Sequence, residues 1–431
     1  MKIAFITPGT GNYHCGVCMR DNSLARSLMN AGHDVIMLPT YLPHVLDEES
    51  VSSDQPIFFG GINVYLQHKF SLFRHTPKWL DRAFDSKWLL RKAAARSGMT
   101  SSKELGEIAL STFRGQDGPL VKEVNKVVDW FRTHEQPDVV LLSTVLLASL
   151  GRTVRRELKV PVYSFLQGED SFLDSLLDEY RDQAWTLLSS DVAQLDACIA
   201  PSRFFGDEMT RRLNLPPEKV HWLSNGINLE GYVPRDEPPS NLSIGFLARL
   251  CPQKGLDLLV DAYLEIMKRG NYPELELRVA GGMTAEDEPY VAEQKKKLKD
   301  AGYLDKATFS PNVDRPAKVK FLRDLTVFSV PARLPEAFGL YVLEALAAGT
   351  PVVLPRQGAF PEIIEATKGG VLYEDNEVTD LADALEGLLA KPDEAFAMGA
   401  KGHEVVLKRF SNDRLAKELV DNILAPKPVS A

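Results

Sequence analysis

Short apolar runs alternate with helical patterns along the first half of the chain, and this alternation limits the fold more than any other feature. The runs KIAFI, HDVIML, PDVVLL, PVYSFL and DACIAP have the length and composition of buried strands. Helical patterns are expected at 19–32, 119–133, 146–157, 171–188 and 202–213. Because consecutive parallel strands need a crossover connection, which is usually a helix, the pattern predicts an α/β fold with a parallel, doubly wound sheet.

A second series of the same kind follows a break in the pattern. Residues 233–241 are polar and rich in proline, which predicts a hinge between domains. Further strands are expected at LSIGFLA, LELRVAGG, LTVFSVP, GTPVVLP and GGVLYE, with helices between them and a helical tail from about 393 to 424. We therefore expect two Rossmann-like domains, one at 1–232 whose last strand and turn lie near 221–229, and one at 233–410.

Length and composition exclude several classes of protein. The chain has 431 residues, of which 44% are hydrophobic and 25% charged, as in a globular protein with two sizeable cores. Its net charge of −9 argues against nucleic acid as the main partner. It has no run of eighteen apolar residues, no signal pattern at MKIAFITPG, and only four cysteines. We expect a cytoplasmic protein without a disulfide framework.

Two stretches fit the alternation poorly. Residues 42–68 are polar and contain glycine, which favours a β-hairpin. Residues 69–100 are basic and aromatic, and Trp79, Phe84 and Trp88 have the spacing of an amphipathic helix. Two roles stay open for this segment. It either packs its aromatic residues into the N-terminal core or rests on an anionic membrane surface, as a peripheral contact at the inner face of the membrane.

The stretch PEAFGLYVLEALAAG, 335–349, is the most informative for chemistry. Its second half is an apolar helix that Gly349 ends, and Glu344 is the only carboxylate or base between Glu336 and Arg356. A buried, ionised carboxylate costs several kcal/mol unless a donor is supplied. Two donors are open for Glu344: a neighbouring Arg or Lys in the core, or a ligand such as a pair of sugar hydroxyls.

The residues just before this helix favour a ligand. The free amides of Phe338, Gly339 and Leu340 at the helix start attract anions or polar ligand atoms. A glycine at 339 lets a ligand approach the backbone closely. Glu336 stands beside these amides.

A pair of cations follows the first strand of the second domain. In FLARLCPQKGLDLL, 246–259, Arg249 and Lys254 lie five residues apart between a strand and a helix. Two cations near a helix start suit a diphosphate, because charge-assisted hydrogen bonds strengthen in a dry site. The alternative is a pair of solvated surface cations.

Together, the R-x4-K and E-x7-E patterns resemble those of the retaining glycosyltransferases of family 4. That family has the GT-B fold, in which two Rossmann-like domains face each other across a cleft. The resemblance implies that Glu336 contacts the donor sugar and Glu344 the ribose of the nucleotide. It also implies that Arg249 and Lys254 stabilise the leaving diphosphate without a metal or other cofactor. The last helix, 411–425, would pack back on the N-terminal domain.

The glycine-rich loop TPGTGNYHCGVCMRDN, 7–22, joins the first strand to the first helix. Such a loop can bring backbone amides to a phosphate or sugar, and the resemblance points to Gly16 as the glycine facing the donor. Cys15 and Cys18 form a single CxxC pattern, for which redox chemistry or half of a zinc site is the alternative. We expect no metal here, because no second CxxC pattern exists. The polar residues at the expected helix start are helix caps or acceptor contacts: Arg20, Asp21 and Asn22.

The loop SFLQGEDSFLD, 164–174, follows a strand of the N-terminal domain. Many family members carry a histidine near the reacting sugar carbon, and Gln167 holds the matching position here. Glutamine cannot take up a proton, but it can hydrogen-bond a sugar hydroxyl. We expect Asp170 to cap the next helix, and the role of Glu169 stays open.

The resemblance as a whole implies a retaining hexosyltransferase that needs no metal. Its donor would be a UDP-, GDP- or ADP-sugar, and its acceptor a carbohydrate, a lipid-linked molecule or a small molecule. Two alternatives stay open: a sugar-nucleotide epimerase or hydrolase on the same fold, and a nucleotide-sugar-binding protein without turnover.

Overall fold

The chain forms two compact units in a computed structural model, which describes residues 1–8, 16–42, 44, 46, 48–52, 55–70, 73, 76, 102–134, 136–374 and 377–424. Unit 1 comprises Met1–Ser224 and Asn412–Ala431, and unit 2 comprises Asn225–Ser411. The division precedes the hinge predicted at 233–241. The segment after Asn225 belongs with unit 2 because Ile227 pairs with Ser411 and its amide donates to the carbonyl of Phe410 at 3.0 Å.

Unit 1 is built on a six-stranded parallel sheet with the order β2-β1-β3-β4-β5-β6. Its strands are β1 (Lys2–Pro8), β2 (Asp34–Thr40), β3 (Val139–Leu142), β4 (Val162–Phe165), β5 (Ala197–Ala200) and β6 (Val220–Trp222). The first five are almost wholly buried apolar runs, as a sheet covered on both faces requires. The register pairs Ile3 with Val35 on one side and with Val139 on the other.

The described residues of unit 1 up to Ser224 form the helices α1 (Gly16–Asn30), α2 (Gly61–Lys69), α5 (Ser102–Arg114), α6 (Val121–Thr133), α7 (Ala148–Leu158), α8 (Glu169–Asp174), α9 (Asp178–Val192) and α10 (Arg203–Arg212). The single helix predicted at 171–188 is wrong, because the backbone of Leu177 is extended and separates α8 from α9. The β-hairpin predicted at 42–68 is wrong over its last part, which forms α2. Within 69–100, the structure describes Lys69, Phe70, Phe73 and Thr76. The rest of this range, with the amphipathic helix predicted there, lies outside the described residues.

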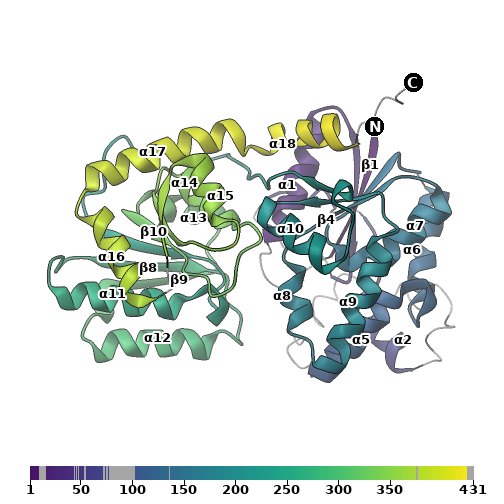
Figure 1. The fold of residues 1–431 in the computed structure, drawn as a ribbon, viewed down its shortest axis with the longest axis horizontal. Coiled ribbons are helices and arrows are strands. Elements are labelled where there is room, and N and C mark those ends of the chain that lie inside the picture. Colours follow the sequence, from purple (N-terminus) through teal and green to yellow (C-terminus); the bar gives the residue numbers. More distant parts are fainter. Residues whose placement is uncertain are drawn as a thin grey trace. The chain divides into compact units, whose positions relative to one another are not determined.

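The C-terminal segment completes unit 1. Helix α18 (Asn412–Glu418) and a π-helical turn (Leu419–Leu424) pack beside α1. The side chain of Asn412 donates to Ser23 at 2.6 Å, and the hydroxyl of Ser27 donates to Asp413 at 2.6 Å. Leu415 joins the same apolar cluster as the β1 strand. Figure 1 shows this segment in yellow beside the purple α1.

Unit 2 repeats the architecture with the strand order β12-β11-β10-β7-β8-β9. Its strands are β7 (Ser243–Leu247), β8 (Glu276–Gly281), β9 (Ala307–Pro311), β10 (Val327–Ser329), β11 (Val352–Pro355) and β12 (Gly370–Tyr373). Strand β9 was not predicted, because it is an edge strand of mixed exposure, without the continuous apolar run of its neighbours. All pairs within this sheet are parallel.

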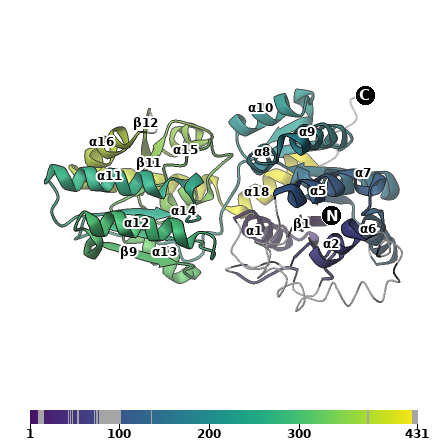
Figure 2. The same ribbon diagram turned by 90° about the horizontal axis from the view of Figure 1, so that it is seen from below.

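The helices of unit 2 cover both faces of its sheet (Figures 1 and 2). Helices α11 (Leu256–Arg269), α12 (Glu288–Asp300) and α16 (Val378–Leu389) lie on one face, while α13 (Arg315–Arg323), α14 (Leu340–Ala347) and α15 (Phe360–Thr367) lie on the other. Helix α17 (Pro392–Arg409) packs against α14 and α15. Among the described residues, we find no helix with the length and apolar character needed to cross a bilayer.

Each sheet has one point where the strand order reverses. In unit 2 this point lies between β7 and β10, and in unit 1 between β1 and β3. At such a point the loops leaving the carboxyl ends of neighbouring strands diverge, and open α/β sheets bind ligands there. The loop after β7 carries Arg249 and Lys254, and the loop after β10 carries Glu336.

Candidate functional site

The loops that leave β7 and β10 touch each other in unit 2. Gly255 has a φ of +72°, and a Cβ atom added there would lie 2.0 Å from the carbonyl oxygen of Pro331. The amide of Arg333 donates to the carbonyl of Gln253 at 2.9 Å. A residue larger than glycine at 255 would push these loops apart, so Gly255 sets how closely they approach.

Lys254 and Glu336, which the sequence predicted separately, form an ion pair. The ammonium group of Lys254 bonds to Oε1 of Glu336, and it lies 5.7 Å from the centre of the Tyr341 ring. The phenol of Tyr341 is buried, and burial together with the charge of Glu336 raises its pKa. A cation, a carboxylate and an aromatic ring therefore meet at the reversal point of the unit 2 sheet.

Residues at the start of α15 hold the segment that leads into α14. The amide of Ala359 donates to the carbonyl of Glu336 at 2.9 Å. Gly339 is the N-cap residue of α14 with a φ of +95°, and a Cβ atom there would lie 2.9 Å from the ring of Phe360. Within the described part of the chain, no acceptor is found for the amides of Phe338, Gly339 and Leu340. These amides remain available to an anion or a polar ligand atom.

Arg249 does not join the Lys254–Glu336 pair. Its guanidinium lies 3.4 Å from Oδ1 of Asp287, and its side chain is 49% exposed. Asp287 is buried and accepts hydrogen bonds from the amide and the hydroxyl of Thr284 at 2.9 and 2.8 Å. The second predicted cation thus lies beside the loop after β8, with much of its side chain open to solvent.

Glu344 finds its donor within the protein. The ammonium group of Lys318, on α13, donates to Oε1 of Glu344 at 2.8 Å, and the two side chains are only 11% and 16% exposed. The lysine partner for Glu344 that the sequence left open is therefore present. Lys318 itself was missed, because nothing in the sequence indicates which residue of α13 faces α14.

Gln167 lies in unit 1, directly after β4. Its backbone amide donates to Oε2 of Glu169 at 2.7 Å, and its side-chain Nε2 is buried without a hydrogen-bond partner among the described residues. Oε1 of Glu169 accepts from the hydroxyl of Thr144 at 2.6 Å and from the amide of Val145 at 3.3 Å. Glu169 therefore joins the loops after β3 and β4, and burial raises its pKa.

The predicted cap at Asp170 is wrong. Helix α8 begins at Glu169, and its N-cap position is Gly168, whose φ is +94°. Asp170 instead occupies the first turn of α8, and burial raises its pKa.

The polar residues of α1 are not helix caps either. The helix begins at Gly16, so Arg20, Asp21 and Asn22 lie in its second turn and are buried. Arg20 pairs with Asp21 at 2.6 Å and stacks on the ring of Phe165 with its guanidinium carbon 3.9 Å from the centre. Burial raises the pKa of Asp21 to about 6, although Arg20 and a hydrogen bond from Ser143 oppose the shift.

In the N-terminal loop 7–22, residues 9–15 lie outside the described residues, and α1 starts at Gly16. Cys15 lies outside the described residues. Cys18 is a buried thiol whose Sγ lies 3.4 Å from the carbonyl oxygen of Pro8. Among the described residues, no three His, Cys, Asp or Glu side chains are grouped closely enough to hold a metal ion.

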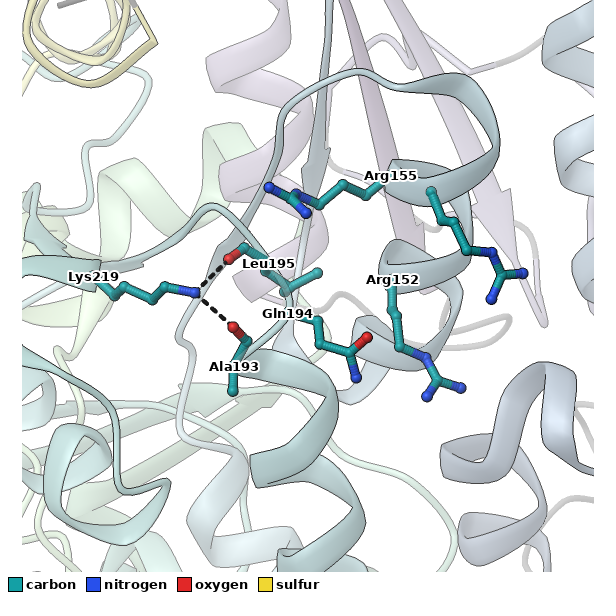
Figure 3. A pocket seen from close by; sticks show the side chains of 7 residues that line it. Arg152, Arg155, Ala193, Gln194, Leu195 and Lys219 are labelled. Atoms are coloured by element: carbon teal, nitrogen blue, oxygen red, sulfur yellow. Dashed lines mark hydrogen bonds between the residues drawn. The ribbon is translucent and has the colours of Figure 1, made fainter.

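A basic pocket lies at the end of the unit 1 sheet where β4 and β5 begin (Figure 3). It has a volume of about 300 Å³ and is lined by Arg152, Arg155, Arg156, Ala193, Gln194, Leu195 and Lys219. Lys219 donates to the carbonyls of Ala193 and Leu195, the dashed lines in Figure 3, at 2.5 and 3.0 Å. Arg155 makes two bonds to Asp196 at 2.7 and 2.9 Å. These cations stabilise the ends of α7 and α9, so we do not count the pocket among the candidate sites.

Two family models match the chain. The model for glycosyl transferases group 1 matches residues 234–405, and the model for glycosyltransferase family 4 matches residues 109–230. Together they cover more than half of the 431 residues.

Curated relatives match part of the chain. A GDP-mannose-dependent alpha-(1-6)-phosphatidylinositol monomannoside mannosyltransferase of Mycobacterium tuberculosis is 31% identical over 222 residues, which are 48% of this chain and 56% of the relative. A D-inositol 3-phosphate glycosyltransferase of Saccharomonospora viridis is 30% identical over 245 residues, 53% of this chain and 56% of the relative. The chain thus spans just over half the length of these relatives.

Solved structures match nearly the whole chain in fold. Sucrose-phosphate synthase of Thermosynechococcus elongatus has a TM-score of 0.71 at 18% identity and covers 97% of each chain. HepE of Anabaena in complex with UDP has a TM-score of 0.68 at 16% identity, covering 98% of this chain and 100% of the other. The architecture of two Rossmann-like units is therefore the GT-B fold.

Proposed function

We infer that this chain is a sugar transferase, because it belongs to the family 4 glycosyltransferases (glycosyl transferases group 1) of GT-B fold. It moves a sugar from a nucleotide-diphosphate sugar to an acceptor hydroxyl. Unit 2 binds the donor, and unit 1 supplies the residues that meet the acceptor. The observation that carries the proposal is the Lys254–Glu336 pair, which lies at the reversal point of the unit 2 sheet beside the free amides at the start of α14.

Each residue of the donor site has a role that follows from its charge or its hydrogen-bonding groups. Lys254 and Arg249 neutralise the diphosphate, and the amides of Phe338, Gly339 and Leu340 donate hydrogen bonds to its oxygens or to those of the sugar. Glu336 contacts the sugar hydroxyls, and its bond to Lys254 holds the carboxylate in place. Glu344 accepts from the ribose. Gly16, at the start of α1, stays a proposed donor contact on the strength of the family resemblance alone.

We propose retention of configuration at the sugar carbon, without a metal. The bond from the anomeric carbon to the phosphate oxygen breaks, and the acceptor oxygen bonds to the same face of the sugar. The leaving phosphate oxygen takes the proton of the acceptor, so the protein needs no base of its own. This route suits Gln167, which cannot take up a proton but whose buried amide can donate to a sugar hydroxyl. Arg249 and Lys254 stabilise the charge that develops on the diphosphate.

The names of the relatives indicate which donors and acceptors to test first. Their names point to GDP-mannose as a donor and to inositol phosphates or phosphatidylinositol mannosides as acceptors. The HepE structures contain UDP and, in one case, UDP-glucose. For this chain we propose a UDP-, GDP- or ADP-sugar donor and a carbohydrate, lipid-linked or small-molecule acceptor. For a lipid-linked acceptor we propose a cytoplasmic location at the inner face of the membrane; residues 69–100, proposed for that contact from the sequence, lie mostly outside the described residues.

The test is release of nucleoside diphosphate from GDP-mannose, UDP-glucose and ADP-glucose, each with and without D-inositol 3-phosphate, phosphatidylinositol mannoside or a simple sugar. The proposal predicts release that depends on one donor and one class of acceptor. Release without any acceptor would instead favour a hydrolase, and a changed sugar with an intact nucleotide would favour an epimerase. Binding of a donor with no release under any condition would favour a nucleotide-sugar-binding protein.

A further inference from the structure

Lys318 pairs with Glu344, the carboxylate of α14, although no feature of the sequence indicated this pairing. It lies in α13, and its ammonium group donates to Oε1 of Glu344 at 2.8 Å. Lys318 is buried, and lysine is rarely buried unless it is paired. The same holds for the carboxylate, which would be costly to bury alone. Each of the two side chains therefore depends on the other.

Helix α13 is fixed so that Lys318 has little freedom to move. Asp314 caps its first turn by accepting from the amide of Ala317 at 2.9 Å. Arg315 donates to the carbonyls of Asn228 and Glu230 at 2.8 and 2.9 Å. At the other end, the hydroxyl of Thr350 donates to the carbonyl of Leu322 at 2.6 Å. The segment just after α14 is thus bonded to the end of α13, which fixes the separation between Lys318 and Glu344.

We propose that Lys318 is the positioning residue that orients Glu344 toward the ribose of the donor nucleotide. This rests on the donor site assigned above. Lys318 holds Oε1, which leaves the second carboxylate oxygen to accept a hydrogen bond from a ribose hydroxyl. Lys318 thus fixes one carboxylate oxygen of Glu344 while the other can accept, which makes hydroxyl recognition possible in this partly buried place.

The consequence is discrimination between nucleotides by their sugar. A nucleotide that lacks the recognised hydroxyl leaves the buried Glu344 carboxylate without its ligand partner, and sites built to bond a hydroxyl reject analogues that lack it. The wild-type protein should therefore bind a nucleoside diphosphate more tightly than its 2′-deoxy or 3′-deoxy form. In the Lys318→Met variant, this preference should shrink because Glu344 loses the hydrogen bond that orients it.

The experiment is calorimetric titration with UDP, GDP and ADP and with the 2′-deoxy and 3′-deoxy forms of each. The proteins are wild type, Lys318→Met, Lys318→Arg and Lys320→Met. Lys320 is the matched control, since it lies on the same helix but is 70% exposed and pairs with Asp324. We expect Lys318→Met to bind the preferred nucleotide about tenfold more weakly and to lose most of its preference over the deoxy forms. Lys318→Arg should restore part of both, and Lys320→Met should change neither.

The outcomes separate this inference from the donor site itself. If the wild type binds none of the nucleotides at millimolar concentration, the donor site fails and the role of Lys318 fails with it. If the wild type prefers the ribonucleotide and Lys318→Met keeps the same preference, the role of Lys318 alone is overturned. Melting temperatures of all variants are measured in parallel. If Lys318→Met does not fold, Lys318→Arg decides, because a displaced guanidinium should still alter the preference for ribose, and an unaltered preference would overturn the inference.

Discussion

Glu336 and Glu344 each lie against a lysine, Lys254 in one case and Lys318 in the other. At the scale of single residues, this arrangement gives each of two partly buried carboxylates a charge-assisted hydrogen bond from within unit 2. Replacing either glutamate by alanine would remove the carboxylate of a partly buried ion pair, so that a loss of stability would be mixed with any loss of binding. Glutamine is therefore the better replacement, since it keeps the shape of the side chain and one oxygen acceptor.

Substitutions at Arg249 and at Glu344 should lower different quantities, the turnover rate in one case and the nucleotide affinity in the other. Arg249→Ala removes a cation that acts on the leaving diphosphate, so we expect kcat to fall about a hundredfold with little change in donor affinity. Glu344→Gln removes the charged ribose acceptor, so we expect nucleotide binding to weaken about tenfold. Steady-state kinetics and nucleotide titration separate the two effects. Equal losses that follow a common loss of folding would return both residues to structural roles.

Asp21 predicts a pH dependence of stability. Its pKa in the folded protein is about 6, above its usual 3.8, so the folded state holds a proton at pH values where the unfolded chain has lost it. This contribution favours folding at low pH and is lost as the pH rises through 6. Relative to Asp21→Asn, the wild type should therefore lose about 2 kcal/mol of unfolding free energy between pH 4.5 and pH 7. Urea unfolding at both pH values measures it, and a constant difference would contradict the assignment.

At the scale of elements, helix α11 offers a direct test of the loop contact at the site. Two glycines with positive φ flank this helix, Gly255 at +72° and Gly270 at +79°. A Cβ atom at Gly270 meets open space, whereas one at Gly255 meets the carbonyl of Pro331. Gly270→Ala should cost about 1 kcal/mol of unfolding free energy from strain alone. Gly255→Ala should cost about 1–3 kcal/mol more, because the loops after β7 and β10 must separate. Urea midpoints that are equal for the two variants would show that the loops do not touch.

The elements also show what the sequence could predict. Apolar runs and helical spacing correctly predicted β1 to β5, β7 and the helix α14, because these elements are buried and strongly patterned. The edge strand β9 and the break in the helical tail at 410–411 lack such a pattern. For the site, the resemblance assigned Lys254 and Glu336 separate roles in one donor site, and the structure brings the two side chains together although 82 residues separate them. Lys318 could not be predicted, since the facing of α13 on α14 depends on tertiary packing.

At the scale of the whole molecule, unit 1 is assembled from both ends of the chain. Leu415 of α18 is buried in the cluster that contains Phe5 of β1, so Leu415→Ala should destabilise unit 1 by about 2–5 kcal/mol. The neighbouring Arg414 is 47% exposed and pairs with Glu418, so Arg414→Ala should cost about 0.5 kcal/mol or less. Hydrogen exchange of β1 and α1 reports the effect. Faster exchange in β7 and α11 instead would contradict the assignment of α18 to unit 1.

In the proposed function, the described part of unit 2 holds a nucleoside diphosphate. The most direct measurement is thermal unfolding of the whole protein with millimolar UDP, GDP or ADP, with and without the attached sugar. A ligand that binds only the folded state raises the melting temperature, and at a hundred times its Kd the shift should be about 5–10 °C. We predict such a shift with one nucleotide and a smaller one in Glu344→Gln. No shift with any of the three would contradict the donor roles of Arg249, Lys254, Glu336 and Glu344.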